Sequence, residues 1–288
     1  MLLSELEYVR PGTVEEAVRL LSGHDNARVL AGGQTLINVM KLRFASPEVL
    51  VDIGSIGGLR SIAVDADGSV QLGAMVTYDD IERSEELARV RPILAEVAGK
   101  IADQQVRNMG TIGGNLCSND PTNHFPPLMA VLGAEMTIRG SDGERTVSVD
   151  EFFQGVYETA VAPGEILTSV RLPGPHPSEG AGFASLTIGR DGTGIVNVAA
   201  ALRCNGSIES PRIAIGCVAA IPARAEGLER ALEGVEPSEA KVRLAAEGLG
   251  ASLDPPGDVH ASASYRRHLA EVLAVRAVMR AIDQALLR

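Results

Sequence analysis

Gly110-Thr-Ile-Gly-Gly-Asn115 and the earlier stretch Ala31-Gly-Gly-Gln-Thr35 are the two segments around which the rest of the sequence is arranged. Each places paired glycines just before an apolar run, with hydroxyl and amide side chains beside them. Glycine has no Cβ and adopts positive φ readily, so backbone N–H groups in such a loop can point together at an oxyanion. The two segments, about eighty residues apart, therefore predict a shared site for a diphosphate ligand.

Neither segment matches the common nucleotide-binding fingerprints. Neither carries the Lys-Ser/Thr pair that ends a Walker P-loop, and neither has the Gly-x-Gly-x-x-Gly spacing of a Rossmann turn. Taken alone, each segment is as compatible with an ordinary tight turn as with a binding loop. Thr35, Thr111 and Asn115 would add side-chain donors at the rim of a shared site.

The 288-residue chain has the composition of a globular protein, with material for one large or two ordinary domains. Its formal net charge of -11 disfavours nucleic acid as a partner, because phosphate backbones are bound by clustered Lys and Arg. No run approaches the roughly eighteen apolar residues that a membrane span needs. The N-terminus also lacks a basic and apolar leader, so we expect a cytoplasmic protein.

The cysteines are Cys117, Cys204 and Cys217, and they contain no Cys-x-x-Cys pair. This number and spacing support neither a disulfide framework nor a zinc site within the chain. They do not support a cysteine-ligated iron–sulfur cluster either. We therefore expect reduced thiols.

Residues up to about 175 predict a domain in which short strands alternate with helices. Thr13 followed by Glu16, and Thr77 followed by Asp80, are capping-box signatures that place two helix starts. Strands are expected at 28–31, 49–53, 61–64, 69–72, 134–139 and 165–172, and helices at 13–22, 36–42, 78–88, 92–102 and 128–132. The stretch 119–127 is dense in Asx and Pro and is expected to be irregular.

A Pro- and Gly-rich stretch at 173–180 predicts a linker, which sets the domain boundaries at 1–175 and 181–288. The second domain is expected to be α+β, with strands at 183–190, 195–203 and 211–220 and helices at 222–233, 237–249 and from 262 onward. In the last helix an apolar stripe is expected to pack over the sheet. Its members are Tyr265, Leu269, Val272, Met279, Ile282 and Leu286.

The sequence around both glycine segments resembles the FAD-binding medium subunit of the molybdenum hydroxylases. That family includes aerobic carbon monoxide dehydrogenase, xanthine dehydrogenase and bacterial enzymes that hydroxylate N-heterocycles. The resemblance is carried by Ala31–Leu36, Met40–Arg43, Leu50–Gly54, Val106–Asn115, Glu165–Pro173, Ile195–Leu202 and Tyr265–Leu269. It covers nearly the whole chain, and Val106–Asn115 is its most specific part.

The resemblance implies an α+β fold. Its first part would be a two-lobed FAD-binding domain of the vanillyl-alcohol-oxidase type, with lobes at about 1–56 and 57–175. A smaller C-terminal α+β domain with a three-stranded sheet would follow. FAD would be held without covalent attachment, its diphosphate between the glycine segments. The cofactor-binding positions carried over are Val29, Leu30, Ala31, Gly32, Gly33, Gln34, Thr35, Leu36, Ile101, Gly110, Thr111, Ile112, Gly113, Gly114, Asn115, His124 and Leu167.

Some of these positions carry alternatives or depart from the family. Ile101 and Leu167 fall where the family contacts the flavin, but a role in the core alone is an equal alternative. His124 stands where many relatives have an acidic residue, and a lone histidine in a Pro-rich loop is more often a surface or turn residue. Some relatives place a basic residue near the position of Ser185, where Arg190 is the nearest candidate.

The resemblance further implies an electron-transfer subunit with no catalytic or metal-ligating residue of its own. Substrate would be oxidised at the molybdenum cofactor of a large subunit, and electrons would reach FAD through two [2Fe-2S] clusters of a small subunit. The complex would be a dimer of heterotrimers that passes electrons to an external acceptor. The cysteine count agrees, because three cysteines cannot hold those clusters.

Two other functions stay open at this stage. One is a stand-alone flavin-dependent reductase of the same superfamily, resembling the peptidoglycan precursor enzyme, which would need its own substrate pocket and proton donor. The other is a scaffold module that has lost its flavin, although the intact glycines and Asn115 argue against loss. A valine at Gly113 or Gly114 is expected to abolish FAD retention while leaving the fold largely intact.

Overall fold

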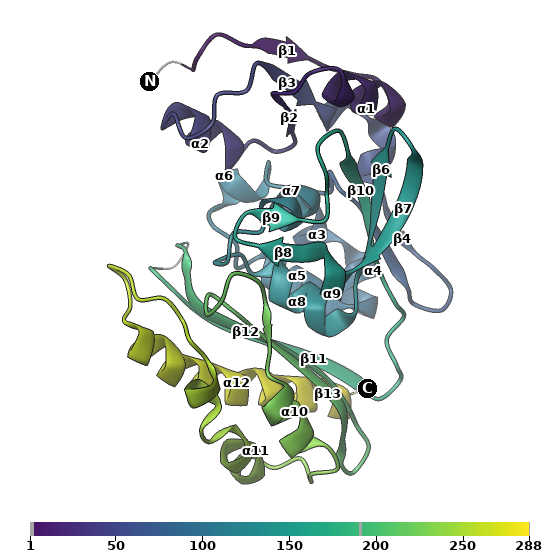
Figure 1. Cartoon of the computed structure of the whole chain (residues 1–288). Helices are drawn as coiled ribbons and strands as arrows, with labels where there is room; N and C mark the ends of the chain where they lie inside the picture. Colours follow the sequence, from purple (N-terminus) through teal and green to yellow (C-terminus); the bar gives the residue numbers. More distant parts are fainter. Residues whose placement is uncertain (1–2, 190–191, 288) are drawn as a thin grey trace.

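The structure is a computed structural model that describes residues 3–189 and 192–287. Figure 1 shows an N-terminal lobe, a middle lobe and a C-terminal domain that follow one another along the molecule. This arrangement confirms the expected fold class, a two-lobed α+β region followed by a smaller α+β domain. No helix within the described ranges combines the length and apolar character needed to cross a membrane.

The N-terminal lobe is a parallel sheet in the order β1-β3-β2. Its strands are β1 (Glu7–Val9), β2 (Ala27–Leu30) and β3 (Val49–Asp52), and the helices α1 (Val14–Ser22) and α2 (Leu36–Lys41) connect them. Helix α1 starts as predicted, because the Thr13 hydroxyl accepts a hydrogen bond from the N–H of Glu16. In open parallel sheets, ligands bind outside the carboxyl ends of the strands, and β2 delivers the first glycine segment to that edge.

The middle lobe is an antiparallel sheet in the order β4-β5-β10-β6-β7. These strands are β4 (Ile62–Val64), β5 (Val70–Gly73), β6 (Glu135–Gly140), β7 (Gly143–Ser148) and β10 (Ile166–Leu172). The helices of this lobe are α3 (Tyr78–Arg83), α4 (Glu85–Val90), α5 (Pro92–Ala98), α6 (Gln104–Arg107), α7 (Ile112–Ser118), α8 (Phe125–Leu132) and α9 (Val149–Phe152). A small hairpin, β8 (Phe153–Gly155) with β9 (Glu158–Thr159), stands apart from the sheet.

Three expectations for the middle lobe were wrong in detail. The helix expected at 78–88 is interrupted at Ser84, whose extended backbone ends α3 while its hydroxyl caps α4. The stretch expected to be irregular becomes helical at Phe125, because Pro126 and Pro127 occupy the first turn, where proline is tolerated. Strand β7 and the β8–β9 hairpin were not predicted.

The C-terminal domain is an antiparallel sheet covered by the long helix α12 (Ala263–Leu286). The strands are β11 (Glu179–Thr187), β12 (Gly194–Cys204), β13 (Ile208–Gly216) and β14 (Ala223–Arg224), so a short fourth strand extends the expected three. Two further helices, α10 (Glu226–Leu232) and α11 (Glu239–Ala246), complete the domain. Strand β11 begins inside the predicted linker.

The stripe predicted for α12 was wrong at both of its ends, since Tyr265 and Leu286 are exposed. The face that packs on the sheet consists largely of alanines with interspersed larger side chains. Small residues are needed there because a Cβ at Gly180 would lie 2.0 Å from the carbonyl oxygen of Ala281. The helix and β11 therefore touch backbone to backbone, a contact that a stripe of large apolar residues would prevent.

The two faces of the C-terminal sheet belong to different cores. On one face, Val198 and Ile213 pack toward α12. On the other face, Phe183, Ala199 and Ala214 join the core of the middle lobe, and α8 packs on this face of the sheet. Strand β12 is consequently buried on both faces, which explains its nearly uninterrupted apolar sequence. Contact across this sheet fixes the C-terminal domain to the middle lobe.

Candidate cofactor site

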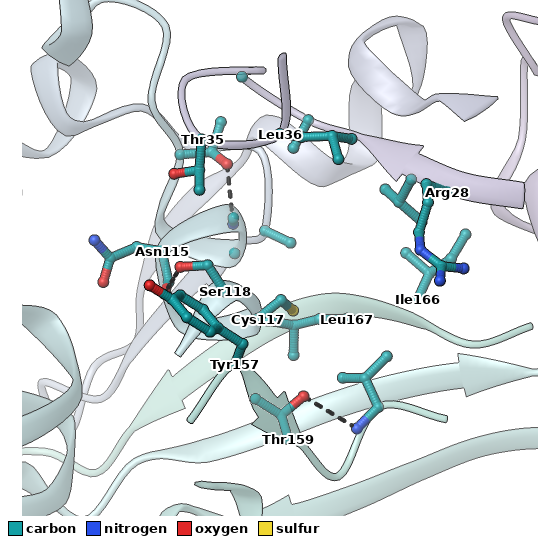
Figure 2. A pocket seen from close by; sticks show the side chains of 18 of the residues that line it. Arg28, Thr35, Leu36, Asn115, Cys117, Ser118, Tyr157, Thr159, Ile166 and Leu167 are labelled. Atoms are coloured by element: carbon teal, nitrogen blue, oxygen red, sulfur yellow. Dashed lines mark hydrogen bonds between the residues drawn. The ribbon is translucent and has the colours of Figure 1, made fainter. Parts of the chain in front are cut away.

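A cavity of about 1340 Å³ lies between the N-terminal and middle lobes (Figure 2). Pockets for drug-sized ligands usually measure roughly 300–1,000 Å³, so this cavity has room for a larger molecule. Both glycine segments line it, and so do two stretches that the sequence analysis did not single out as site residues, 117–123 and 157–166. Those stretches carry no glycine motif, and they reach the cavity through the end of α7, the β8–β9 hairpin and the start of β10.

Most of the predicted site residues are brought together here. The ones that line the cavity are Val29, Ala31, Gly32, Gly33, Gln34, Thr35, Leu36, Gly110, Thr111, Gly113, Gly114, Asn115 and Leu167. The backbone at Gly32 lies directly against Met109 and Gly110, so the two segments converge as expected. Gly33 has φ +71°, a left-handed conformation that favours glycine.

Four predicted positions lie outside the lining of this cavity. Leu30 borders a smaller cavity of about 370 Å³ behind Gly32 and Gly33, and Ile112 is fully buried in the core. Ile101 packs on the core of the middle lobe. His124 is 5% exposed and lies against the Phe183 ring, so the expectation of a surface position was wrong. Arg190 lies outside the described residues.

The second glycine segment differs from the expected loop, because its residues from Ile112 onward form the first turn of α7. Thr111 caps this helix, and its hydroxyl accepts a hydrogen bond from the N–H of Gly114 at 3.1 Å. The N–H groups of Ile112 and Gly113 donate to the carbonyl oxygens of Val76 and Ala74, each at 2.9 Å. These amides are therefore used within the protein and do not form a cradle for an anion.

The first glycine segment has the opposite character. In the described residues, no hydrogen bond uses the N–H groups of Gly33, Gln34, Thr35 or Leu36, although all four residues line the cavity. Helix α2 begins at Leu36 without a side-chain cap on its first turn. Backbone N–H groups at the start of a helix need partners, and an anion can supply them. This segment is the one that can receive a diphosphate.

The glycines of the second segment serve close packing instead. A Cβ at Gly113 would lie 2.6 Å from both the Cβ and the carbonyl oxygen of Ala74. We therefore expect a substitution there to displace α7 and to lower fold stability as well as FAD binding. At Gly114 the nearest atoms would be the Thr111 hydroxyl at 2.9 Å and the Ala31 Cβ at 3.8 Å. Gly114 therefore faces the first glycine segment across the cavity.

Asn115 is the central polar side chain of the cavity wall. Its amide nitrogen donates to the hydroxyl of Tyr78 at 2.9 Å, and burial raises the pKa of that phenol to about 12. The side-chain oxygen of Asn115 is buried and accepts no hydrogen bond from the described residues. A buried acceptor without a partner is costly, so this atom is suited to a donor on a bound ligand.

The two ends of the cavity differ in chemistry. Figure 2 shows Asn115, Ser118 and Tyr157 toward one end, Arg28 and Ile166 toward the other, and Leu167 beside Cys117 in the middle. Asp120, which accepts a hydrogen bond from Tyr157, belongs to the first end, and Val29, which follows Arg28 on β2, belongs to the second. The first end is polar, whereas the second combines the Arg28 guanidinium with apolar side chains. Cys117 lies between them, and burial raises its pKa to about 12, which keeps the thiol protonated.

The C-terminal domain supports the polar end. Asn197, fully buried on β12, donates its side-chain N–H to the carbonyl oxygen of Asn123 at 3.2 Å. Asn123 in turn donates to the carbonyl oxygen of Asn115 at 2.9 Å. The N–H of Cys217 donates to the carbonyl oxygen of Pro121 at 2.9 Å. All three parts of the chain thus contribute to one site.

Comparison with known proteins identifies relatives along nearly the whole chain. A family model described as "FAD binding domain in molybdopterin dehydrogenase" matches residues 4–175, and one described as "CO dehydrogenase flavoprotein C-terminal domain" matches residues 186–281. The carbon monoxide dehydrogenase medium chain of Afipia carboxidovorans is 39% identical, covering 99% of both chains. The nicotine 6-hydroxylase medium subunit of Paenarthrobacter nicotinovorans is 34% identical, covering 98% of this chain and 99% of the relative.

Solved structures agree with these sequence matches. A chain of carbon monoxide dehydrogenase from Hydrogenophaga pseudoflava superimposes with a TM-score of 0.94 at 36% identity, covering 99% of both chains. A chain of quinoline 2-oxidoreductase from Pseudomonas putida 86 superimposes with a TM-score of 0.94 at 33% identity, covering 99% of this chain and 100% of the other.

Proposed function

The chain belongs to the FAD-binding medium subunits of the molybdenum hydroxylases, and on this premise we propose that it carries electrons between a partner subunit and an external acceptor. It is an oxidoreductase subunit with FAD as its cofactor, and the molybdenum and iron–sulfur groups belong to other subunits. FAD supplies the conversion between one-electron and two-electron transfer. The protein supplies binding and orientation.

The observation that carries this proposal is the set of unpaired backbone N–H groups from Gly33 to Leu36 at the cavity wall. They give the FAD diphosphate its donors, while the second segment, with its amides already used, forms the facing wall. This division of roles explains why both segments carry glycines for different reasons. At Gly33 a left-handed backbone is required, and at Gly113 there is no space for a side chain.

The remaining residues of the cavity fit the other parts of the cofactor. The end at Ile166 would receive the purine ring, with Arg28 as its charged side chain. The polar end at Asn115 and Asn123 matches the polar edge of an isoalloxazine ring, and the unpaired oxygen of Asn115 would accept a hydrogen bond there. The same end has the exposed surface that electron exchange with other molecules requires.

We place the subunit in a complex with a large molybdenum-cofactor subunit and a small iron–sulfur subunit, arranged as a dimer of heterotrimers in the cytoplasm. Relatives over nearly the full chain are named as medium chains or subunits, which supports such an assembly. Electrons would enter from the [2Fe-2S] clusters of the small subunit and leave to an external acceptor.

The visible spectrum of the purified full-length chain, combined with activity assays, tests this function. We expect flavin absorption bands and no turnover of organic substrates or carbon monoxide in the absence of partners. Turnover by the lone chain would instead identify a self-sufficient flavin reductase. A colourless chain that stays colourless after FAD is supplied would identify a scaffold, and either result would overturn the proposal.

Copurification from the native source tests the assembly separately. We expect a tagged chain to bring down a cysteine-rich small subunit and a larger subunit that contains molybdenum. A flavin-loaded chain that elutes alone under gentle conditions would contradict the partner arrangement while leaving FAD binding intact.

A further inference from the structure

Tyr157 stands at the tip of the β8–β9 hairpin and borders the cavity (Figure 2). Its side chain is 64% exposed, although the chain contains only four tyrosines and no tryptophan. Its backbone has φ +58°, a left-handed conformation that is uncommon for a residue with a side chain. Exposed aromatic surface and backbone strain at the same residue are typical of positions that contact ligands.

The β8–β9 hairpin is held in place by Asn119 at the C-terminal end of α7. Asn119, 1% exposed at the end of that helix, donates its side-chain N–H to the carbonyl oxygens of Gly155 at 2.6 Å and Glu158 at 3.2 Å. The N–H of Tyr157 donates to the carbonyl oxygen of Asn119 at 3.2 Å, and the Tyr157 hydroxyl donates to Asp120 at 3.3 Å. These hydrogen bonds fix the turn that carries Tyr157 and hold its side chain at the edge of the cavity.

The polar end of the cavity, where Tyr157 lies, suits the isoalloxazine ring of FAD better than its adenine ring. Ser118 lies beside Tyr157 in Figure 2, and Asp120 accepts a hydrogen bond from the Tyr157 hydroxyl, whereas the opposite end contains Arg28 and Ile166. The isoalloxazine ring has a polar edge and must be reachable by electron donors and acceptors, and Tyr157 lies at an exposed rim. A flat aromatic ring gains affinity from contact with a second one.

We propose that Tyr157 packs its phenol ring against the isoalloxazine ring of FAD and positions that ring at the mouth of the cavity. This inference rests on the proposed function and adds a cofactor-contacting residue that neither glycine segment contains. The hydrogen bond to Asp120 sets the ring orientation, and the face of the phenol provides the contact.

Three variants of the full-length chain test the contact. Tyr157→Leu removes the aromatic ring, Tyr157→Phe keeps it without the hydroxyl, and Val156→Ala changes a neighbouring exposed side chain of the same hairpin. Tyrosine, phenylalanine and leucine all carry an unbranched Cβ, so the left-handed backbone is equally strained in each. Differences among these three therefore report on the ring.

The measurements are FAD affinity, visible absorption and flavin fluorescence of each apoprotein titrated with FAD. A phenol stacked on an isoalloxazine quenches its emission by transferring an electron to the excited flavin. We expect Tyr157→Leu to emit more per bound FAD, to shift the flavin bands, and to bind about twofold to tenfold more weakly. Emission from Val156→Ala should match the wild type, and Tyr157→Phe should bind within about twofold of it.

Equal affinity and emission for Tyr157→Leu and the wild type would overturn the contact. Weaker binding with unchanged flavin bands and emission would also overturn it, because the ring would then touch another part of FAD. These results differ from a wild-type chain that binds no FAD, which would overturn the proposed function itself and this inference with it.

Discussion

A Cβ at position 32 would lie 1.9 Å from the carbonyl oxygen of Met109, so Gly32 and Met109 meet backbone to backbone where the two lobes join. The contact holds the first glycine segment against the residue that precedes the second. It brings the unpaired N–H groups of 33–36 to the wall formed by α7. The shape of the site therefore depends on one position that has no space for a side chain.

Replacing Gly32 with alanine should separate the lobes at this contact. Since the obstructing atom belongs to the backbone, it cannot turn away as a flexible side chain would. We expect a loss of about 1–3 kcal/mol in the free energy of unfolding, together with at least tenfold weaker FAD binding. Urea denaturation and FAD titration measure the two effects. Gly58→Ala is the matched control, because no atom lies within 4 Å of a Cβ there, and a similar loss in both variants would contradict this account.

The convergence of the glycine segments could be predicted from the sequence. That the first offers unpaired N–H groups to a ligand while the second packs against the protein could not be predicted. A glycine pair near hydroxyl residues indicates that another group lies close to the backbone. It does not indicate whether that group belongs to a ligand or to the protein itself. At Gly113 the neighbour is Ala74 of the protein itself, and the amide of Gly113 is already bonded to it. Only the tertiary pairing of Ala74 with the start of α7 reveals this.

Other differences have the same origin. The capping signatures at Thr13 and Thr77 are local, and both helix starts were confirmed, although the reciprocal capping box forms only at Thr77. The face of α12 depends on Gly180 of β11, which lies about a hundred residues earlier in the chain. Apolar periodicity therefore found Leu269 and Ile282 but missed the alanines and wrongly included Tyr265 and Leu286. The position of Tyr157 at the cavity could not be predicted from the sequence, because it depends on a hairpin that packs on α7.

Alanine at Gly113 and alanine at Gly114 should have different effects. At Gly113 the new Cβ meets Ala74, so we expect a loss of about 1–3 kcal/mol in the free energy of unfolding. At Gly114 the new Cβ points toward Ala31 and the cavity, and the gain of up to about 1 kcal/mol in helix propensity offsets crowding at Thr111. We expect Gly114→Ala to stay within about 1 kcal/mol of wild-type stability while binding FAD several times more weakly.

Thermal unfolding of the apoproteins, followed by FAD titration, separates these outcomes. If Gly114→Ala bound FAD as tightly as the wild type, Gly114 would not face the cofactor. If Gly113→Ala proved as stable as the wild type, the close packing of α7 on Ala74 would be refuted.

The cap at Thr111 links the stability of α7 to the site. Thr111→Ala removes the acceptor for the Gly114 N–H and should lower the free energy of unfolding by about 1 kcal/mol. FAD binding should weaken as well, because Thr111 itself lines the cavity and the first turn of α7 that it caps forms the wall. Thr13→Ala removes the equivalent cap of α1 away from the cavity and should cost similar stability with unchanged FAD affinity. Equal FAD affinities for the two variants would show that the Thr111 cap is structural only.

His124 should make the protein less stable in mild acid. Burial lowers its pKa from 6.5 to about 4, because the charged imidazolium would be desolvated beside Phe183. The unfolded chain binds a proton near pH 6.5 and the folded chain does so only near pH 4, so stability is fully present above pH 6.5 and falls below it. Between pH 7 and pH 5 the expected loss from this group is about 2 kcal/mol.

Urea denaturation of the wild type and of His124→Phe at pH 7 and pH 5 measures this contribution. Phenylalanine keeps a planar ring beside Phe183 and cannot be protonated, so the variant should lose about 2 kcal/mol less than the wild type over that interval. His24→Gln changes an exposed histidine at the end of α1 and should follow the wild type. An identical acid dependence in the wild type and His124→Phe would mean that the imidazole of His124 is solvated when the protein is folded.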